Sequence, residues 1–448
     1  MPDLTVMKRP LHLQQTEIAS LLLHLNSLTG LVFLQDQQHP VIGFLPQAYL
    51  QVQNGQSHFM QRNEQLGYQV QEQTINCTDF IAFAPTREPA DAGFQGGIIG
   101  FVSYDFAAQQ QIQNQSKEQP ALYFGRYRSY LKQEQGQWYF YSDEAQAEQL
   151  WQLINRLFMQ PLSTEADFQL TQPCQARWSR QDYQHAFTQV QDYIRAGDCY
   201  QINLTQEFTG VAQGELLATA QQFWQLTNAP YAGYLKLDGF ELLSCSPELF
   251  IDFQADRKMS TRPIKGTMPR HADPQQDEQS RQQLAASQKD QAENVMIVDL
   301  LRNDLSVYAE NGSVKTPILF EIESFNQVHH MVSEVTAILK PEVNPIEMLL
   351  SALPGGSITG APKIRAMQII EELEGAPRGA YCGSMGYFNL DGTGRWNILI
   401  RSIQKYQDQL SLWAGGGITI ASDSDAEYQE CFDKVSAMLN LLNTWQKP

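Results

Sequence analysis

Thr261-Arg262-Pro263-Ile264-Lys265-Gly266-Thr267 places one lysine between a proline and a glycine. Proline fixes its own φ and favours an extended preceding residue, whereas glycine lets the backbone bend sharply or approach a ligand closely. In a regular strand, Lys265 would share a face with Pro263 and Thr267. A lysine beside a hydroxyl can serve as a nucleophile or an anion anchor, although a lysine at a strand end is more often simply solvated. Its role therefore depends on partners elsewhere in the chain.

A helix and a strand are predicted upstream of this stretch. Residues 180–196 carry apolar side chains at helical spacing and stop at Gly197, which predicts an amphipathic helix. Residues 199–205 then alternate between apolar and polar side chains, which predicts a strand. Its apolar face holds Tyr200, Ile202 and Leu204, and its polar face holds Gln201, Asn203 and Thr205. The polar face can line a wet cavity or meet solvent, and the alternation alone favours solvent.

Two pairs of carboxylates lie at helical spacing. Asp290 and Glu293 fall within one predicted helix, and Glu427 and Glu430 fall within a last helix predicted to run to residue 442. Carboxylates from two helices suit a hard cation such as Mg²⁺, which takes one or two protein carboxylates with water and substrate oxygens. The alternative is that these carboxylates are ordinary exposed residues without a ligand, because the chain is acidic throughout. Lys434, one turn after Glu430, can bind an anion or form a surface ion pair.

Two glycine-rich runs and one histidine are further candidates. Residues 354–363 open a predicted helix, whose N-terminal amides can bind an anion. This run is not a Walker loop, because Lys363 follows a proline. Gly415-Gly416-Gly417 would let backbone amides approach a ligand, although either run alone is more often a turn. His330 can transfer protons, but a lone histidine in a strand is more often a core or surface residue.

The composition excludes some classes of partner. The 448 residues carry a net charge of −18 with a pI near 4.9, so neither a nucleic acid nor an anionic membrane is expected to bind. The six cysteines include no C-x-x-C pair, which argues against a zinc ribbon or a disulfide framework. With no run of about 18 apolar residues and no secretory leader in view, we expect a reduced cytoplasmic protein.

The sequence pattern divides the chain into two regions. Residues 1–160 carry short aromatic and β-branched runs that predict an antiparallel sheet, 161–179 form a polar linker with two prolines, and 180–448 hold the motifs above. One large domain and two fused lobes are both compatible with this length. We expect the two regions to form one globular unit.

Taken in order, these motifs resemble those of the chorismate-utilising enzyme family. The resemblance is concentrated in residues 180–442, with a looser match over 20–145. It is carried by residues 196–204, Ser246-Pro247-Glu248-Leu249-Phe250, Pro263-Ile264-Lys265-Gly266-Thr267, residues 293–300, Arg302-Asn303-Asp304, residues 356–363 and Gly415-Gly416-Gly417. It implies an α+β fold in which two antiparallel β-sheets pack as a sandwich surrounded by helices, as in anthranilate synthases.

Two positions indicate a branch of the family. Isochorismate and salicylate synthases carry a water-activating lysine where this chain has Gln201, so the chain resembles the ammonia-using members. Anthranilate synthases usually have alanine at position 265, whereas Lys265 matches the para-aminobenzoate branch. The resemblance implies conversion of chorismate and ammonia to 4-amino-4-deoxychorismate for folate biosynthesis, with ammonia from a separate glutamine amidotransferase subunit. The alternatives are anthranilate formation or, in another class, a non-catalytic chorismate sensor.

The resemblance also implies a role for each candidate residue. Lys265 would attack C2 of chorismate while Glu248 protonates the departing C4 hydroxyl, and ammonia would then add at C4 and expel the lysine. Mg²⁺ would bind the ring carboxylate of chorismate. Its protein ligands would be Glu293 and Glu430, with Asp290 and Glu427 supporting them. Further substrate contacts would come from Gln201, Thr267, His330, Thr359, Tyr381, Arg401, Gly415, Gly416, Gly417 and Lys434. Because an ordinary lysine is neutral only about once in a thousand molecules near pH 7.4, Lys265 is expected to have a lowered pKa.

Overall fold

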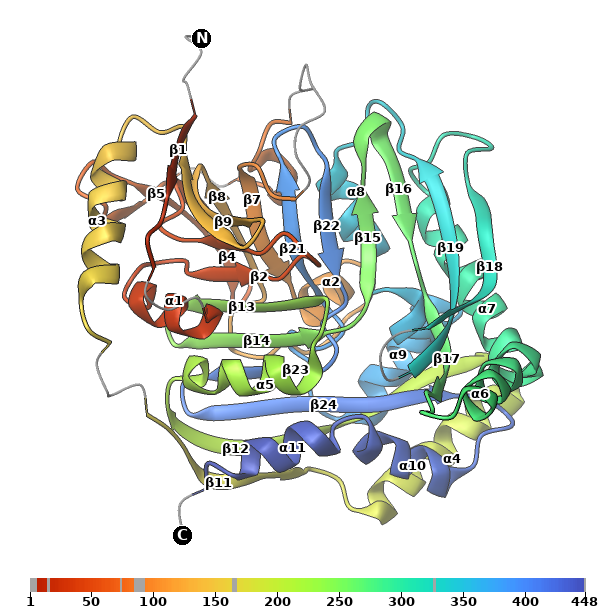
Figure 1. The fold of residues 1–448 in the computed structure, drawn as a ribbon. Helices are drawn as coiled ribbons and strands as arrows, with labels where there is room; N and C mark the ends of the chain where they lie inside the picture. Colours follow the sequence, from red (N-terminus) through yellow and green to blue (C-terminus); the bar gives the residue numbers. More distant parts are fainter. Residues whose placement is uncertain are drawn as a thin grey trace.

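A computed structural model describes residues 6–13, 17–72, 75–83, 93–162, 167–324 and 328–446. Within these residues the strands form two large antiparallel sheets, and most of the helices lie on the outside (Figure 1). The two sheets meet through their apolar faces. Phe101 of one sheet stacks on Phe240 of the other, with ring centroids 5.6 Å apart. The predicted α+β sandwich is confirmed.

The first sheet has the spatial order β1 (Met7–Pro10), β10 (Gln137–Ser142), β9 (Ser129–Glu134), β3 (Val41–Gly43), β2 (Val32–Leu34), β13 (Tyr231–Leu237), β14 (Phe240–Ser246), β23 (Ser402–Tyr406), β24 (Gln409–Ile418), β12 (Gln201–Gly214) and β11 (Phe168–Ala176), with β20 (Gly360–Ala361) paired to β12. The second sheet has the order β17 (Ile264–Pro269), β19 (Val328–Ile338), β16 (Lys258–Thr261), β15 (Leu249–Phe253), β22 (Gly394–Asn397), β21 (Ser384–Asn389), β7 (Gly97–Val102), β8 (Leu122–Tyr127), β4 (Ala48–Gln53), β5 (Gln56–Arg62) and β6 (Tyr68–Val70), with β18 (Lys315–Ser324) paired to β19.

The helices of the described residues are α1 (Ile18–Leu25), α2 (Tyr104–Gln109), α3 (Ala147–Met159), α4 (Arg180–Ala196), α5 (Ala220–Thr227), α6 (Pro274–Ala286), α7 (Gln288–Ser306), α8 (Pro345–Ala352), α9 (Lys363–Glu374), α10 (Ser424–Asp433) and α11 (Ser436–Asn443). A short 3₁₀ turn, η4 (Gly356–Ile358), precedes β20. In the part of the chain that the structure describes, no helix combines the length and the apolarity that crossing a membrane requires. All six cysteines are free thiols.

Both sheets contain strands from both regions of the sequence. In the first sheet β2 pairs with β13, and in the second β7 pairs with β21. The N-terminal region therefore shares its sheets with the C-terminal region instead of forming a separate sheet. The predicted linker, 161–179, includes the strand β11, which pairs with β12 along the edge of the first sheet.

The predicted helix at 180–196 is confirmed as α4. Ser179 and Asp182 form a reciprocal capping box at its start, and Gly197 ends it with φ +83°. Its apolar stripe, which includes Tyr183 and Val190, packs in one core cluster with β12, α9 and α10. Burial of each large apolar side chain stabilises the fold by about 1.5–3 kcal/mol. This packing fixes the strand that carries Gln201.

The last predicted helix is two helices, α10 and α11. The chain breaks at Val435, whose φ of −128° and ψ of −2° are not helical. Cys431 on α10 belongs to the core cluster around α4, whereas Val435, Met438 and Leu442 belong to a different cluster under the first sheet. One straight helix cannot serve both clusters, so the axis changes direction between them.

Candidate active site

β17 carries Lys265 on a bulge. Ile264 pairs with Val332 and Thr267 pairs with His330, so β17 contains one more residue than β19 over this interval. The alternation predicted for a regular strand, with Lys265 and Thr267 on one face, does not continue through the bulge. The local direction of the lysine is therefore set by the bulge.

Gly266 makes this bulge possible. Its φ is +86°, and a Cβ atom placed there would lie 2.9 Å from Leu284 Cδ1 and 3.0 Å from Asp290 Cβ. Helices α6 and α7 therefore pack directly against β17. Asp290, one of the predicted metal-site carboxylates, lies beside the strand of Lys265.

Charged groups from several segments surround Lys265. Burial lowers the pKa of Lys265 below its ordinary value against the opposing effect of Glu248; Lys434 adds to the lowering, and Glu293 and Glu430 oppose it. The net lowering increases the fraction of neutral amine, which is the form that attacks carbon. Figure 1 shows that β17, α7, α10 and one end of β24 gather at the lower right of the molecule.

Glu248 is suited to hold a proton. Burial raises the pKa of Glu248, although Lys265, Arg401 and Lys434 act to lower it. A carboxyl group with a raised pKa keeps a larger protonated fraction and can donate to a leaving group. Burial also lowers the pKa of the Arg401 guanidinium, which Glu248 partly offsets. The predicted acid, the nucleophile and one predicted substrate-binding arginine therefore lie within electrostatic reach of one another.

The three glycines of β24 lie very close to β12 and to the acidic side chains of α10. Gly415, Gly416 and Gly417 pair with Thr205, Leu204 and Asn203 of β12. A Cβ atom at Gly417 would lie 2.1 Å from Gln201 Nε2, and one at Gly415 would lie 2.1 Å from the carbonyl oxygen of Leu204. At Gly416 it would lie 2.9 Å from Glu427 Oε2 and from Glu430 Oε1. We call β12, β20 and β24 around these glycines the glycine wall.

The polar face of β12 is buried, contrary to the expectation that it meets solvent. Gln201, Asn203 and Thr205 are 5%, 8% and 0% exposed. Asn203 donates from Nδ2 to the carbonyl of Ile358 at 3.0 Å. Among the described residues Gln201 Oε1 is buried without a hydrogen-bond partner. An unsatisfied buried acceptor is costly, so this oxygen is suited to receive a donor from a small ligand.

Thr359 and Tyr381 take part in the packing of the glycine wall. Thr359 is buried, and its hydroxyl donates to the carbonyl of Gly355 at 2.9 Å. Tyr381 is 5% exposed and stacks on Trp413 of β24, with ring centroids 5.9 Å apart. The Thr359 hydroxyl is thus used by the turn before β20 and the Tyr381 ring by β24, while Lys265 and Glu248 act on the pKa of each other.

Thr267 and His330 form a pair across β17 and β19. Thr267 Oγ1 lies 2.8 Å from His330 Nδ1. Burial and Arg401 lower the pKa of His330, with Glu323 opposing them, so the imidazole is mainly neutral near pH 7. A neutral imidazole can accept a proton or polarise a substrate oxygen.

The four predicted metal-site carboxylates converge on the site from two helices. Glu427 and Glu430 of α10 lie against Gly416. On α7, Asp290 lies against Gly266 and the charge of Glu293 acts to raise the pKa of Lys265. Burial raises the pKa of Glu427, although the hydroxyl of Ser422 donates to it at 2.7 Å. Within the described ranges no three His, Cys, Asp or Glu side chains form a metal-ligating group. Mg²⁺ takes only one or two protein carboxylates beside substrate and water oxygens, which is compatible with these four side chains, and a Mg²⁺ site here stays a prediction.

Lys434 bridges the metal-site carboxylates and the glycine wall. Its Nζ lies 2.6 Å from Glu430 Oε1 and donates to the carbonyl of Gly415 at 2.8 Å. An ammonium group in this position can also contact a carboxylate of a bound anion. The i,i+4 ion pair considered from the sequence is therefore present, and it lies at the site.

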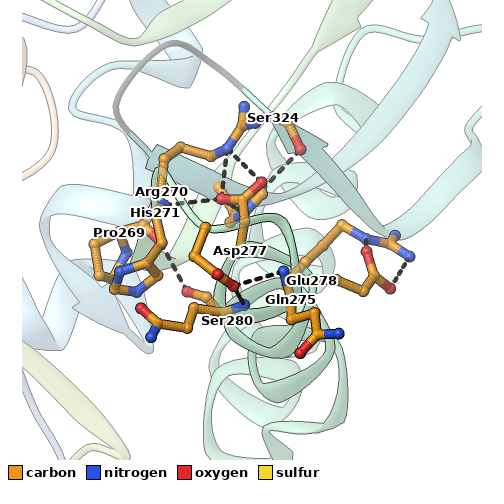
Figure 2. Close-up of polar contacts among 12 residues, drawn as sticks. Pro269, Arg270, His271, Gln275, Asp277, Glu278, Ser280 and Ser324 are labelled. Carbon is orange, nitrogen blue, oxygen red and sulfur yellow. Dashed lines mark hydrogen bonds and ion pairs between the residues drawn. The ribbon is translucent and has the colours of Figure 1, made fainter.

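A polar cluster anchors the far end of β17 (Figure 2). Asp277 of α6 accepts from Arg270 Nε at 2.8 Å and from the backbone N–H of His271 at 3.0 Å. The Arg270 guanidinium holds the pKa of Asp277 well below its usual range. The imidazole of His329 joins Asp277, at 3.1 Å, to Ser324 of β18, at 2.8 Å. Sequence reasoning missed this cluster, although the adjacent histidines were a visible signal.

Comparison with known proteins supports a single family. A model of chorismate binding enzymes matches residues 30–440. The chain is 44% identical over 359 residues to "Aminodeoxychorismate synthase component 1" of Klebsiella aerogenes, covering 78% of each chain. It is 42% identical over 381 residues to the protein of the same name from Escherichia coli K12, covering 84% of this chain and 82% of that one.

A solved structure agrees with this relationship. Anthranilate synthase component I from Streptococcus pneumoniae TIGR4 superposes with a TM-score of 0.77 at 26% identity, over 90% of this chain and 92% of that one. The agreement extends over both sheets and therefore over both regions of the sequence. The family match, the relatives and the convergence of Lys265, Glu248 and the acidic helices show that the chain belongs to the chorismate binding enzymes.

Proposed function

We propose that this chain acts as an aminodeoxychorismate synthase component I, which converts chorismate and ammonia to 4-amino-4-deoxychorismate and water. The observation that carries the proposal is the placement of Lys265, with its lowered pKa, within electrostatic reach of the partly buried acid Glu248. The name shared by the relatives from Klebsiella aerogenes and Escherichia coli supports it. The product belongs to the para-aminobenzoate and folate branch.

The side chains divide the reaction into two displacements. The neutral amine of Lys265 forms a bond to C2 of the chorismate ring, the ring double bond shifts, and the C4 hydroxyl departs as water with the proton of Glu248. Ammonia then forms a bond to C4, the double bond shifts back, and the C2–nitrogen bond to Lys265 breaks. The covalent intermediate replaces one difficult substitution by two easier ones.

Mg²⁺ would be held by Glu293 and Glu430, with Asp290 and Glu427 supporting them. When bound, such an ion neutralises a substrate carboxylate and withdraws electrons from the ring. We assign to Arg401 and Lys434 the remaining negative charge of chorismate, since both cations act on Glu248 and Lys434 also contacts Gly415. Both helices α7 and α10 would thereby contribute to substrate orientation.

Ammonia is the proposed second substrate because of Gln201. A carboxamide has no basicity with which to activate water, but its unpartnered Oε1 can accept an N–H bond from ammonia. The words "component 1" in the relatives' names imply a further component. We assign to it the supply of ammonia from glutamine, by a separate amidotransferase subunit in the cytoplasm.

Product analysis tests the proposal. The protein is incubated with chorismate, Mg²⁺ and ammonium chloride, and the products are identified by mass spectrometry. We expect aminodeoxychorismate without pyruvate. Anthranilate with pyruvate would assign the chain to the anthranilate branch, isochorismate would contradict the role of Gln201, and binding without turnover would identify a sensor.

A further inference from the structure

Arg378 and Glu374 form an ion pair that protein encloses completely. Each side chain is 1% exposed. The guanidinium donates from Nε and from Nη2 to the two carboxylate oxygens, at 2.8 and 2.7 Å. Such a two-bond pair fixes orientation as well as charge. Neither side chain takes part in the bond-making steps proposed above.

The pair holds two segments of the glycine wall. Arg378 donates from Nη2 to the carbonyl of Asn203 at 2.8 Å and from Nη1 to the carbonyl of Ile358 at 3.1 Å. Glu374 accepts from the backbone N–H and the hydroxyl of Thr205 at 2.9 and 2.6 Å. One buried pair therefore fixes β12 and the turn that leads into β20.

These contacts lie next to Gln201 in the fold. Gln201 pairs with Ala361 of β20, and the N–H of Asn203 donates to the carbonyl of Thr359 at 2.8 Å. On the other side, Gly417 leaves no room for a methyl group beside Gln201 Nε2. The carboxamide is confined between backbone that Arg378 holds and a strand that approaches it closely.

We propose that Arg378 is a positioning residue for the amination step. It fixes the carbonyls of Asn203 and Ile358 and thereby the place of the Gln201 carboxamide that receives ammonia. The inference rests on the proposed function, because it concerns the second substrate of that reaction. Lys265 belongs to the other sheet, and the guanidinium of Arg378 bonds to Glu374, Asn203 and Ile358, so we expect loosening of Arg378 to weaken the use of ammonia more than the attack on chorismate.

A purely structural role would have a different signature. Arg62 and Glu144 form a second buried pair, 2% and 6% exposed, and Arg62 also donates to the carbonyl of Leu45. Arg62 ends β5, near the opposite edge of the second sheet from β17. Arg62→Lys is therefore a matched control: it perturbs a buried arginine pair without touching the glycine wall.

The test compares Arg378→Lys with Arg62→Lys. For Arg378→Lys we expect the KM for ammonium at saturating chorismate to rise at least about tenfold. The KM for chorismate and the yield of the Lys265 adduct formed without ammonia, measured by mass spectrometry, should change less than about twofold. Arg62→Lys should lower the midpoint of thermal unfolding to a similar extent and leave the KM for ammonium unchanged.

Either an unchanged KM for ammonium in Arg378→Lys or an equal rise in Arg62→Lys would overturn the proposal. Absence of amination by the unaltered protein would overturn the proposed function with it. If Arg378→Lys does not fold, Thr205→Val decides, since it removes the hydroxyl bond to Glu374 in a side chain of the same shape. It should raise the KM for ammonium about threefold, whereas Thr205→Ser should not; equal values for the two variants would overturn the proposal.

Discussion

The strand of Lys265 and the glycine wall both contribute residues to the candidate active site, but different contacts hold them in place. β17 is bulged, and its end is tied by polar contacts of partly exposed groups such as Arg270 and Asp277. The glycine wall is held by the buried pair of Arg378 and Glu374. Exposed ion pairs contribute about 0–1 kcal/mol, whereas removing one partner of a buried pair costs about 3–5 kcal/mol. The proposed nucleophile therefore lies on the more adjustable support, and the proposed ammonia site lies on the more rigid one.

Lys265→Ala should have the largest effect, because it removes the reacting atom from the adjustable side. We expect amination to fall at least about 10⁴-fold, since alanine offers no amine to form the covalent intermediate. The Kd for chorismate, measured by titration calorimetry with Mg²⁺, should change less than about threefold. Lys258→Ala is the control, because its exposed side chain lies on β16 of the same sheet, away from the proposed Mg²⁺ carboxylates. A Lys265→Ala protein with an undiminished rate would refute the nucleophile role.

Alanine substitutions at Gly417 and Gly266 should show whether the glycine wall and β17 support different steps of the reaction. Gly417→Ala forces the Gln201 amide away, so the KM for ammonium should rise while the Lys265 adduct still forms. Gly266→Ala strains the bulge, so formation of the adduct itself should fall. Each should lower the free energy of unfolding by about 1–3 kcal/mol.

Gly136→Ala provides the reference for these two variants. Gly136 has a positive φ like Gly266, but nothing lies within 4 Å of a Cβ atom there. The Gly136→Ala protein should lose stability through backbone strain alone. Its KM for ammonium and its formation of the Lys265 adduct should not change. If Gly417→Ala and Gly266→Ala impair the same step, the two supports do not have separate roles.

The pKa of Lys265 should make stability depend on pH. Because folding lowers this pKa, the unfolded chain binds more protons between the folded value and 10.5. The free energy of unfolding contributed by this group therefore rises with pH across that interval. Lys265→Met should remove the rise and stabilise the protein below the interval. Urea unfolding of both proteins from about pH 7 to about pH 10 measures the difference, and parallel curves would show that the pKa is not lowered.

Asp277→Asn should have the smallest effect. It weakens the polar cluster at the end of β17, which is partly exposed, so the amination rate should change less than about twofold. Glu278→Gln, which alters an exposed pair with Arg281 on the same helix, is the matched control. A loss in Asp277→Asn comparable to that in Arg378→Lys would show that β17 is as sensitive to its supports as the glycine wall.

The sequence indicated candidate reactive side chains more readily than the side chains that support them. Lys265 and the acidic pairs stand in local motifs and Glu248 follows from the family resemblance, and the structure brings these groups near one another. For the polar face of β12 the sequence favours solvent over a wet cavity, since the alternation is the same whether Gln201 meets water or is buried. Arg378 and Glu374 were missed, because a buried ion pair depends on burial that only the fold creates. The break at Val435 was missed for a similar reason, since two separate cores set it.

The interleaved strands have a consequence for biosynthesis. β21 and β22 lie inside the second sheet between β7 and β15, and β23 and β24 lie inside the first, so the blue strands of Figure 1 sit among red, orange and green ones. While the chain is being made, the strands of the first half have unpaired edges until residue 418 has left the ribosome. Pairing between such distant segments also slows folding. A nascent chain of this protein is therefore expected to expose unpaired strand edges, which favour aggregation, until β24 has been synthesised.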